Sequence, residues 1–217
     1  MIPPPICQER ALRVIQNLNR FAKPTNTVTG LSGRSVPDVA SIPEALKNVL
    51  DLVSHEFELD RITIKNEIPN NLPPVSIDPH QLEEVLFNLI VNAAQAMREK
   101  DGELVIAGKV IGGGRASVIP AIFKRESRNS GSPIKTFGDD SKNITLTIQD
   151  TGSGIPQNQM KHLFEPFRTT KGDKGTGLGL YITKQIIERS GGRISVNSQE
   201  EKGTVFTLEF KVQRNAG

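Results

Sequence analysis

The stretch Asp78–Met97, DPHQLEEVLFNLIVNAAQAM, constrains the fold more than any other part of the sequence. Asp78 can cap a helix, Pro79 suits the first helical position, and Gln81 stands where a capping-box partner would stand. Apolar residues then recur at helical spacing, at Leu82, Val85, Leu86, Leu89, Ala93, Ala96 and Met97. The stretch therefore predicts a long helix that buries one face in a core.

A second line of residues on this helix is polar and consists of Glu84, Asn88, Asn92 and Gln95. Asn88 and Asn92 lie one turn apart, and apolar residues flank their stripe on both sides. Two interpretations stay open at this point. The amides either form the solvent-facing side that most helices have, or face a polar ligand or a metal ion.

Composition limits the classes of protein to consider. At 217 residues and 36% hydrophobic content, the chain fits one domain of ordinary size, and its net charge of +3 brings no tract typical of nucleic-acid binding. The single cysteine, Cys7, excludes an internal disulfide and a metal cluster around it. No apolar run approaches the ~18 residues of a membrane span, and no signal peptide is visible. We expect a cytoplasmic setting without membrane contact by this chain.

Hydrophobic periodicity predicts helices and strands in a mixed order. Helices are expected at Pro43–Phe57, Asp78–Met97 and Leu178–Ser190, and strands at Arg61–Asn66, Glu103–Val110, Asn143–Gln149, Arg193–Asn197 and Thr204–Val212. This order favours an α/β two-layer sandwich, in which helices cover one face of a mixed, mostly antiparallel sheet. Residues 112–142, rich in Gly, Ser, Lys and Arg, are expected to form a flexible insertion between two paired strands.

The first 34 residues are expected to lie outside the domain that is predicted at 35–217. Cys7–Ala22 has the pattern of an amphipathic helix, and a linker rich in Thr, Ser, Gly and Pro follows it. The helix either docks on its own domain or is the tail of a longer element that makes a dimer contact.

Asp150-Thr-Gly152-Ser-Gly154-Ile155 directly follows a predicted strand. The strand would fix the carboxylate, and the two glycines would let the backbone approach a flat ligand. A buried carboxylate needs a donor, and the exocyclic amine of adenine would serve. The alternative is a tight turn with a surface aspartate.

A second glycine motif, Gly175-Thr-Gly177-Leu-Gly179-Leu180, opens a predicted helix. Its N–H groups and the helix terminus suit a phosphate, although the spacing matches neither the Walker nor the dinucleotide pattern. The alternative is a flexible loop. Before it, Phe164-Glu-Pro-Phe167 is expected to anchor one end of a mobile lid, with Lys171 either reaching a phosphate or lying in solvent.

These motifs together resemble a known family. The asparagine helix, Asp-x-Gly-x-Gly-Ile, Phe-x-Pro-Phe and Gly-Thr-Gly-Leu-Gly-Leu occur in the order of the N, G1, F and G2 boxes of sensor histidine kinases. Their catalytic domain belongs to an ATPase superfamily shared with gyrase, Hsp90 and MutL. The likeness covers about residues 35–212, and Gln8–Pro24 resembles the end of the second dimerisation helix of nitrogen-regulator-type kinases.

The resemblance implies roles for single residues. Asn92 would ligate the Mg²⁺ that bridges the ATP phosphates, Asn88 would support the phosphate side, and Gln95 stands where many members carry a lysine. Asp150 would bind the adenine amine, with Thr204 assisting. The remaining nucleotide contacts implied are Gly152, Gly154, Ile155, Thr170, Lys171, Gly175, Thr176, Gly177, Leu178 and Gly179.

The activity implied is transfer of the γ-phosphoryl group from ATP–Mg²⁺ to a histidine in two-component signalling. His55, His80 and His162 do not lie in the family's acceptor pattern, so the acceptor is expected on a separate phosphoacceptor and dimerisation domain, with a response regulator beyond it. A homodimer is expected only in a full-length protein. Two alternatives stay open: a non-kinase ATP-binding regulator, and a Ser/Thr protein kinase of the same superfamily.

Overall fold

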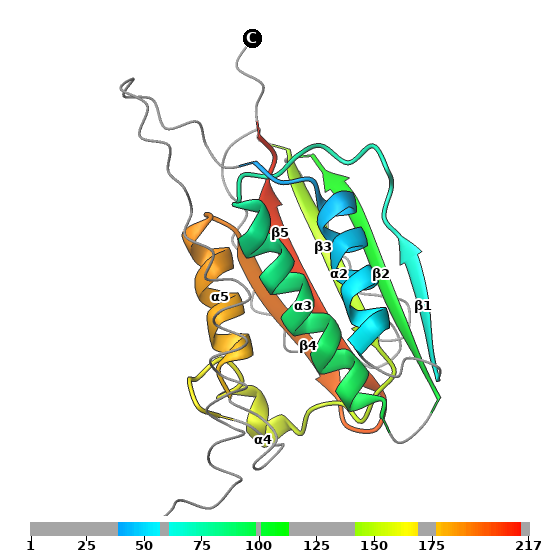
Figure 1. Ribbon diagram of the computed structural model, residues 1–217. Helices are drawn as coiled ribbons and strands as arrows, with labels where there is room; N and C mark the ends of the chain where they lie inside the picture. Colours follow the sequence, from blue (N-terminus) through cyan, green and yellow to red (C-terminus); the bar gives the residue numbers. More distant parts are fainter. Residues whose placement is uncertain (1–38, 57–60, 99–100, 113–141, 169–176, 214–217) are drawn as a thin grey trace, which may run out of the picture.

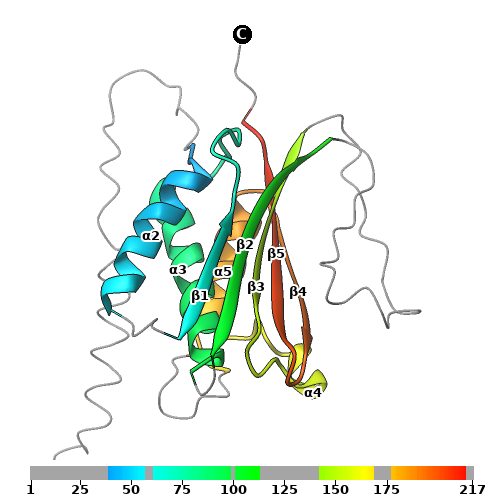
Figure 2. The same ribbon diagram turned by 90° about the vertical axis from the view of Figure 1, so that its right-hand side faces the viewer.

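The computed structural model describes residues 39–56, 61–98, 101–112, 142–168 and 177–213. They form two layers, a five-stranded sheet and a layer of helices on one of its faces (Figures 1 and 2). The helices are α2 (Ile42–Glu56), α3 (Pro79–Ala96), α4 (Gln157–Met160) and α5 (Gly179–Arg189), and the strands are β1 (Ile62–Glu67), β2 (Gly102–Ile111), β3 (Asn143–Asp150), β4 (Arg193–Gln199) and β5 (Gly203–Lys211). The predicted α/β sandwich is confirmed.

The sheet has the strand order β1-β2-β3-β5-β4. β1 and β2 run parallel, and the other three pairs are antiparallel, so the sheet is mixed and mostly antiparallel, as predicted. Strand β3 shows why the alternation in its sequence was informative. Ile144, Leu146 and Ile148 are buried under the helices, whereas Thr147 and Gln149 on the other face are only half-buried.

Helix α3 lies at the centre of the helical layer, between α2 and α5 (Figure 1). Its start follows the sequence signal, because the Asp78 side chain accepts a hydrogen bond of 2.9 Å from the Gln81 backbone N–H. Its apolar face is completely buried at Leu82, Val85, Leu86, Leu89 and Ile90. This face fixes the rotation of α3, and therefore the direction of its polar line.

Two features were not predicted. Helix α4 is a single turn of three polar residues and a methionine, QNQM, too short to produce a periodic pattern. In addition, Val75 pairs with both Ala40 and Val212, which joins the segment before α2 to the end of β5. Isolated single-residue bridges of this kind leave no pattern in sequence, since each needs only one pair of backbone groups.

Several expectations fall outside the described residues. They are the amphipathic helix at Cys7–Ala22 and the insertion between β2 and β3, of which residues 113–141 are not described. Within the described ranges, the longest apolar helix still falls short of what crossing a bilayer requires.

Candidate functional site

Asp150 is the last residue of β3 and is 3% exposed. Its Oδ1 accepts hydrogen bonds from the backbone N–H groups of Gly152, at 2.8 Å, and Thr204, at 3.3 Å. Thr204 faces it directly, because the two residues are partners in the β3–β5 ladder. These donors compensate the buried charge and fix the rotation of the carboxylate.

The loop after Asp150 is held between the end of α3 and the β4–β5 turn. A Cβ on Gly152 would lie 2.6 Å from the Cβ of Ala96, and the Ser153 N–H donates to the Ala96 carbonyl at 3.1 Å. Gly154 has φ of +69°, and a Cβ there would overlap the Gln199 carbonyl. Only glycine fits both positions, because the backbone here packs closely against Ala96 and Gln199. The approach of this backbone to a flat ligand stays a prediction.

The second glycine segment lies against α3 more than two helical turns before the first. A Cβ on Gly179, at the start of α5, would lie 3.4 Å from Oδ1 of Asn88. Helices α3 and α5 lie side by side and run in opposite directions (Figure 1). The N-terminus of α5 therefore lies beside the lower half of α3 in this view. Asn88 therefore faces the start of α5, where unsatisfied N–H groups favour an anion.

Helix α3 is thus a common wall for both glycine segments. The Ala96 carbonyl accepts from Ser153 in the loop after β3, and Asn88 lies beside Gly179 at the start of α5. Eight residues of helix separate the two contacts, which is about 12 Å along the axis. Asn92 lies between them and is half-buried like Asn88, whereas Gln95 is exposed. Asn88 is thus half-buried beside the start of α5, and a ligand-binding role for the amide line stays a prediction.

Glu84 lies one turn before Asn88 on the same line and is half-buried. Burial raises the pKa of its carboxyl above the ordinary value. In the described ranges no ion pair or hydrogen bond of the side chain offsets this. Because the pKa is raised by folding, ionised Glu84 opposes the folded state, and this loss of stability grows as the pH rises through the pKa.

Glu84→Gln is accordingly expected to stabilise the fold at pH 7 by less than about 1 kcal/mol. The gain should disappear at low pH, where the wild-type carboxyl is protonated. Thermal unfolding of both proteins between pH 4 and pH 8 measures this. Glu200→Gln, at an exposed position in the β4–β5 turn, is the matched control. A gain independent of pH would contradict the electrostatic cause.

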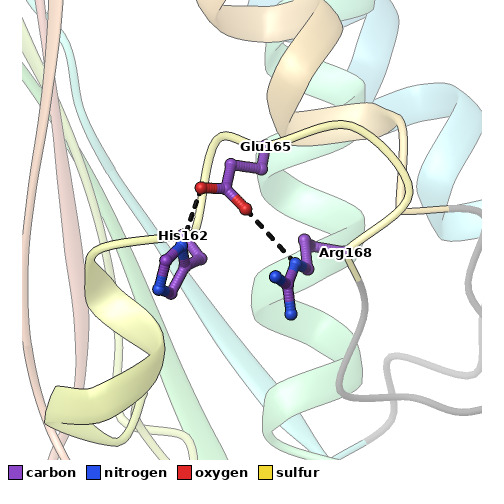
Figure 3. A network of polar contacts seen from close by, with 3 residues as sticks. All are labelled: His162, Glu165 and Arg168. Carbon is purple, nitrogen blue, oxygen red and sulfur yellow. Dashed lines mark hydrogen bonds and ion pairs between the residues drawn. The ribbon is translucent and has the colours of Figure 1, made fainter.

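The segment after α4 carries a small polar network on its surface (Figure 3). Glu165 accepts from His162 Nδ1 at 2.7 Å and from Arg168 Nε at 3.2 Å. The pKa of the Glu165 carboxyl is lowered, first by the hydrogen bond from His162 and further by the charges of both partners. Phe164, in the same segment, packs against the core, and the Lys184 ammonium lies 5.5 Å from its ring centroid.

Phe167 corrects one expectation. Two phenylalanines were expected to anchor this segment, but only Phe164 does so, and Phe167 is 75% exposed with φ of +62°. A positive φ is costly for an aromatic residue. Gly177 follows closely in space, since its own Cβ would lie 2.5 Å from the Phe167 carbonyl carbon. Periodicity does not detect such a backbone conformation.

The structure places the residues implied by the sequence in two groups along α3. Near Ala96 lie Asp150, Gly152, Gly154, Ile155 and Thr204. Eight residues earlier on α3, Asn88 lies beside Gly179, with Gly177 and Leu178 leading into α5, and Asn92 lies on α3 between the two groups. Thr170, Lys171, Gly175 and Thr176 lie outside the described residues. Ser198, which bonds to Thr204 and Ile155, was missed, because a serine in a polar strand gives no signal.

A model of the family described as histidine kinase-, DNA gyrase B-, and HSP90-like ATPases matches residues 77–214. The chain belongs to this family. The matched range begins just before α3 and includes every element of the site above, so the family's characteristic region is the region in which the glycine segments meet α3.

The chain is similar in sequence to several kinases. The chain is 30% identical over 204 residues to sensor histidine kinase ZraS of Escherichia coli, covering 94% of the chain and 36% of ZraS. It is 29% identical over 175 residues to sporulation kinase E of Bacillus subtilis, covering 81% of the chain and 20% of that kinase. The chain therefore spans about a third of these relatives or less.

Solved structures show the same fold. The catalytic domain of histidine kinase ThkA, in a nucleotide-free form, matches with a TM-score of 0.58 and 25% identity. That match covers 81% of this chain and 97% of the ThkA domain. The sandwich and its helical layer are thus shared with a histidine kinase ATPase domain over nearly its full length.

Proposed function

We propose that this chain is the ATP-binding catalytic domain of a protein-histidine kinase. It binds ATP with Mg²⁺ and donates the γ-phosphoryl group to a histidine nitrogen of a dimerisation domain, releasing ADP. The similarity to sensor histidine kinase ZraS favours this activity over a non-kinase regulator or a Ser/Thr kinase. Residues 35–217 form the catalytic domain in this proposal, and the first 34 residues form the end of a dimerisation helix, as in nitrogen-regulator-type kinases.

One observation carries the proposal: α3 contacts both glycine segments, at Ala96 and at Asn88. A nucleotide along α3 would place its base beside Asp150 and its phosphates beside Asn88 and the start of α5. The buried carboxylate would accept the adenine amine, and the N–H groups of the helix start would donate to phosphate oxygens. Phosphoryl transfer needs this positioning more than it needs covalent chemistry from the protein.

The donor set suits magnesium. Asn88 and Asn92, whose side chains carry amide oxygens, lie one turn apart on α3. Mg²⁺ usually takes one or two protein oxygens and fills its shell with phosphate and water. In the described parts of the chain, no three His, Cys, Asp or Glu side chains are grouped so that they could hold a metal ion. When bound, the ion neutralises phosphate charge, and Asn92 would hold it.

Asn88 also bears on the choice of acceptor. The gyrase-like members have a general-base glutamate at this position, whereas an amide does not take a proton from water. Slow basal ATP hydrolysis and a protein acceptor follow from this difference. His80 and His162 are exposed beside Glu83 and Glu165, which fits surface residues, so we place the acceptor histidine on the dimerisation domain and a response regulator beyond it. The proposed location is cytoplasmic.

The test is calorimetric titration of the chain with a non-hydrolysable ATP analogue, with and without Mg²⁺. Wild type is expected to bind more tightly with Mg²⁺, and Asn92→Ala to lose most of this difference, roughly tenfold in Kd, because one charge-assisted contact to the ion is removed.

The matched control is Asn197→Ala, which removes an exposed amide on β4. It should retain the full Mg²⁺ dependence. Binding of the analogue that is indifferent to Mg²⁺ in wild type would contradict the metal role, and absence of binding would reject the proposed function.

A further inference from the structure

Three side chains form a row across the sheet at the base end of the site. Ser198 of β4 pairs with Thr204 of β5, and Thr204 pairs with Asp150 of β3. Paired residues of neighbouring strands point to the same face of a sheet. Thr204 is 3% exposed, and Ser198 is half-buried.

The hydroxyl of Ser198 makes three hydrogen bonds. Its partners are the Ile155 N–H at 2.8 Å, the Gly203 carbonyl at 2.9 Å and the Thr204 hydroxyl at 2.9 Å. A serine hydroxyl has one hydrogen and two acceptor sites. A carbonyl only accepts, so the Ser198 hydrogen goes to Gly203. Ser198 must then accept from both Ile155 and Thr204.

This assignment fixes the proton of Thr204. Its hydroxyl hydrogen points to Ser198, which leaves the lone pairs of Thr204 Oγ1 as the part available to a ligand. The described residues supply no donor to those lone pairs. Oγ1 therefore presents a buried acceptor next to the Asp150 carboxylate.

We propose that Ser198 is a positioning residue for base recognition, because it holds Thr204 as an acceptor and fixes Ile155 at the rim of the base site. The inference rests on the proposed function. An edge built of acceptors complements the 6-amino group of adenine and opposes the 6-oxo group of hypoxanthine or guanine. Ser198 thereby contributes to discrimination between 6-amino and 6-oxo purines without touching the nucleotide.

The experiment compares the dissociation constants of ADP and inosine diphosphate by calorimetry. Wild type is expected to prefer ADP by at least about 100-fold. Ser198→Ala frees the Thr204 hydroxyl to rotate and donate, so the preference should fall roughly tenfold. Ser198→Thr keeps a hydroxyl and should retain the preference. Ser195→Ala, at an exposed position on the opposite face of β4, should leave it unchanged.

The ratio of the two dissociation constants distinguishes a positioning role of Ser198 from a general loss of stability, which would weaken both nucleotides equally. Equal weakening of both nucleotides in Ser198→Ala, or an unchanged ratio, would overturn the assignment. If Ser198→Ala does not fold, Thr204→Val and Thr204→Ser decide instead: the first should lose the preference and the second keep it. Failure of wild type to bind ADP at all would reject the proposed function itself, a result distinct from ADP binding with an unaltered ratio.

Discussion

Asp150→Asn is expected to weaken ADP binding by tenfold to about 150-fold, which corresponds to about 1.5–3 kcal/mol. An asparagine can keep the oxygen that accepts from Gly152 and Thr204, so the loop should stay in place. Its amide nitrogen then presents hydrogens where the adenine amine also presents hydrogens. The loss is large because the position is only 3% exposed, and water does not replace the missing acceptor.

Calorimetric titration with ADP measures this effect, and thermal unfolding establishes that the variant is folded. Asp101→Asn, at an exposed position before β2, removes the same charge away from the site and should bind ADP like wild type. Unaltered affinity in Asp150→Asn would show that Asp150 does not contact the base.

Gly203→Ala should be the most destabilising of the single substitutions considered, at about 2–4 kcal/mol. Gly203 starts β5 with φ of +110°, a conformation that side chains avoid. A Cβ there would also overlap the carbonyl oxygen of Asp150, which is backbone of the neighbouring strand and does not yield. The midpoint of thermal unfolding should fall by roughly 5–15 °C.

Gly112→Ala provides the control for this substitution. Gly112 follows β2, is exposed and has open space around an added Cβ, so its effect should stay within about 0.5 kcal/mol. Urea unfolding of both variants gives the comparison. Similar stabilities for the two would mean that the β5 backbone adapts to a side chain at position 203.

The sequence was most informative where one face of an element is buried. In β3 the apolar residues alternate with polar ones, and this pattern predicted both the strand and the face that it buries. For α3, the cap at Asp78 predicted where the helix begins, and the apolar stripe predicted its buried face. Both signals come from burial, which selects residue types at fixed intervals.

The site was predictable where glycine is the only residue that fits. Gly152 and Gly154 pack against other backbone, so their identity carries information. Phe167 and Ser198 were not predictable, because their roles depend on a φ angle and on partners brought from distant strands. Single hydrogen bonds of this kind leave no periodicity in a sequence.

The bridge at Val75 has a mechanical consequence. Ala40 and Val75 exchange two backbone hydrogen bonds, of 3.0 and 2.9 Å, and Val75 also pairs with Val212 just beyond β5. A pulling force on the chain before α2 would therefore be transmitted through these bridges to β5 before it could separate α2 from the core. A domain tethered in front of Ala40 would pull on the same strand that carries Thr204 at its far end.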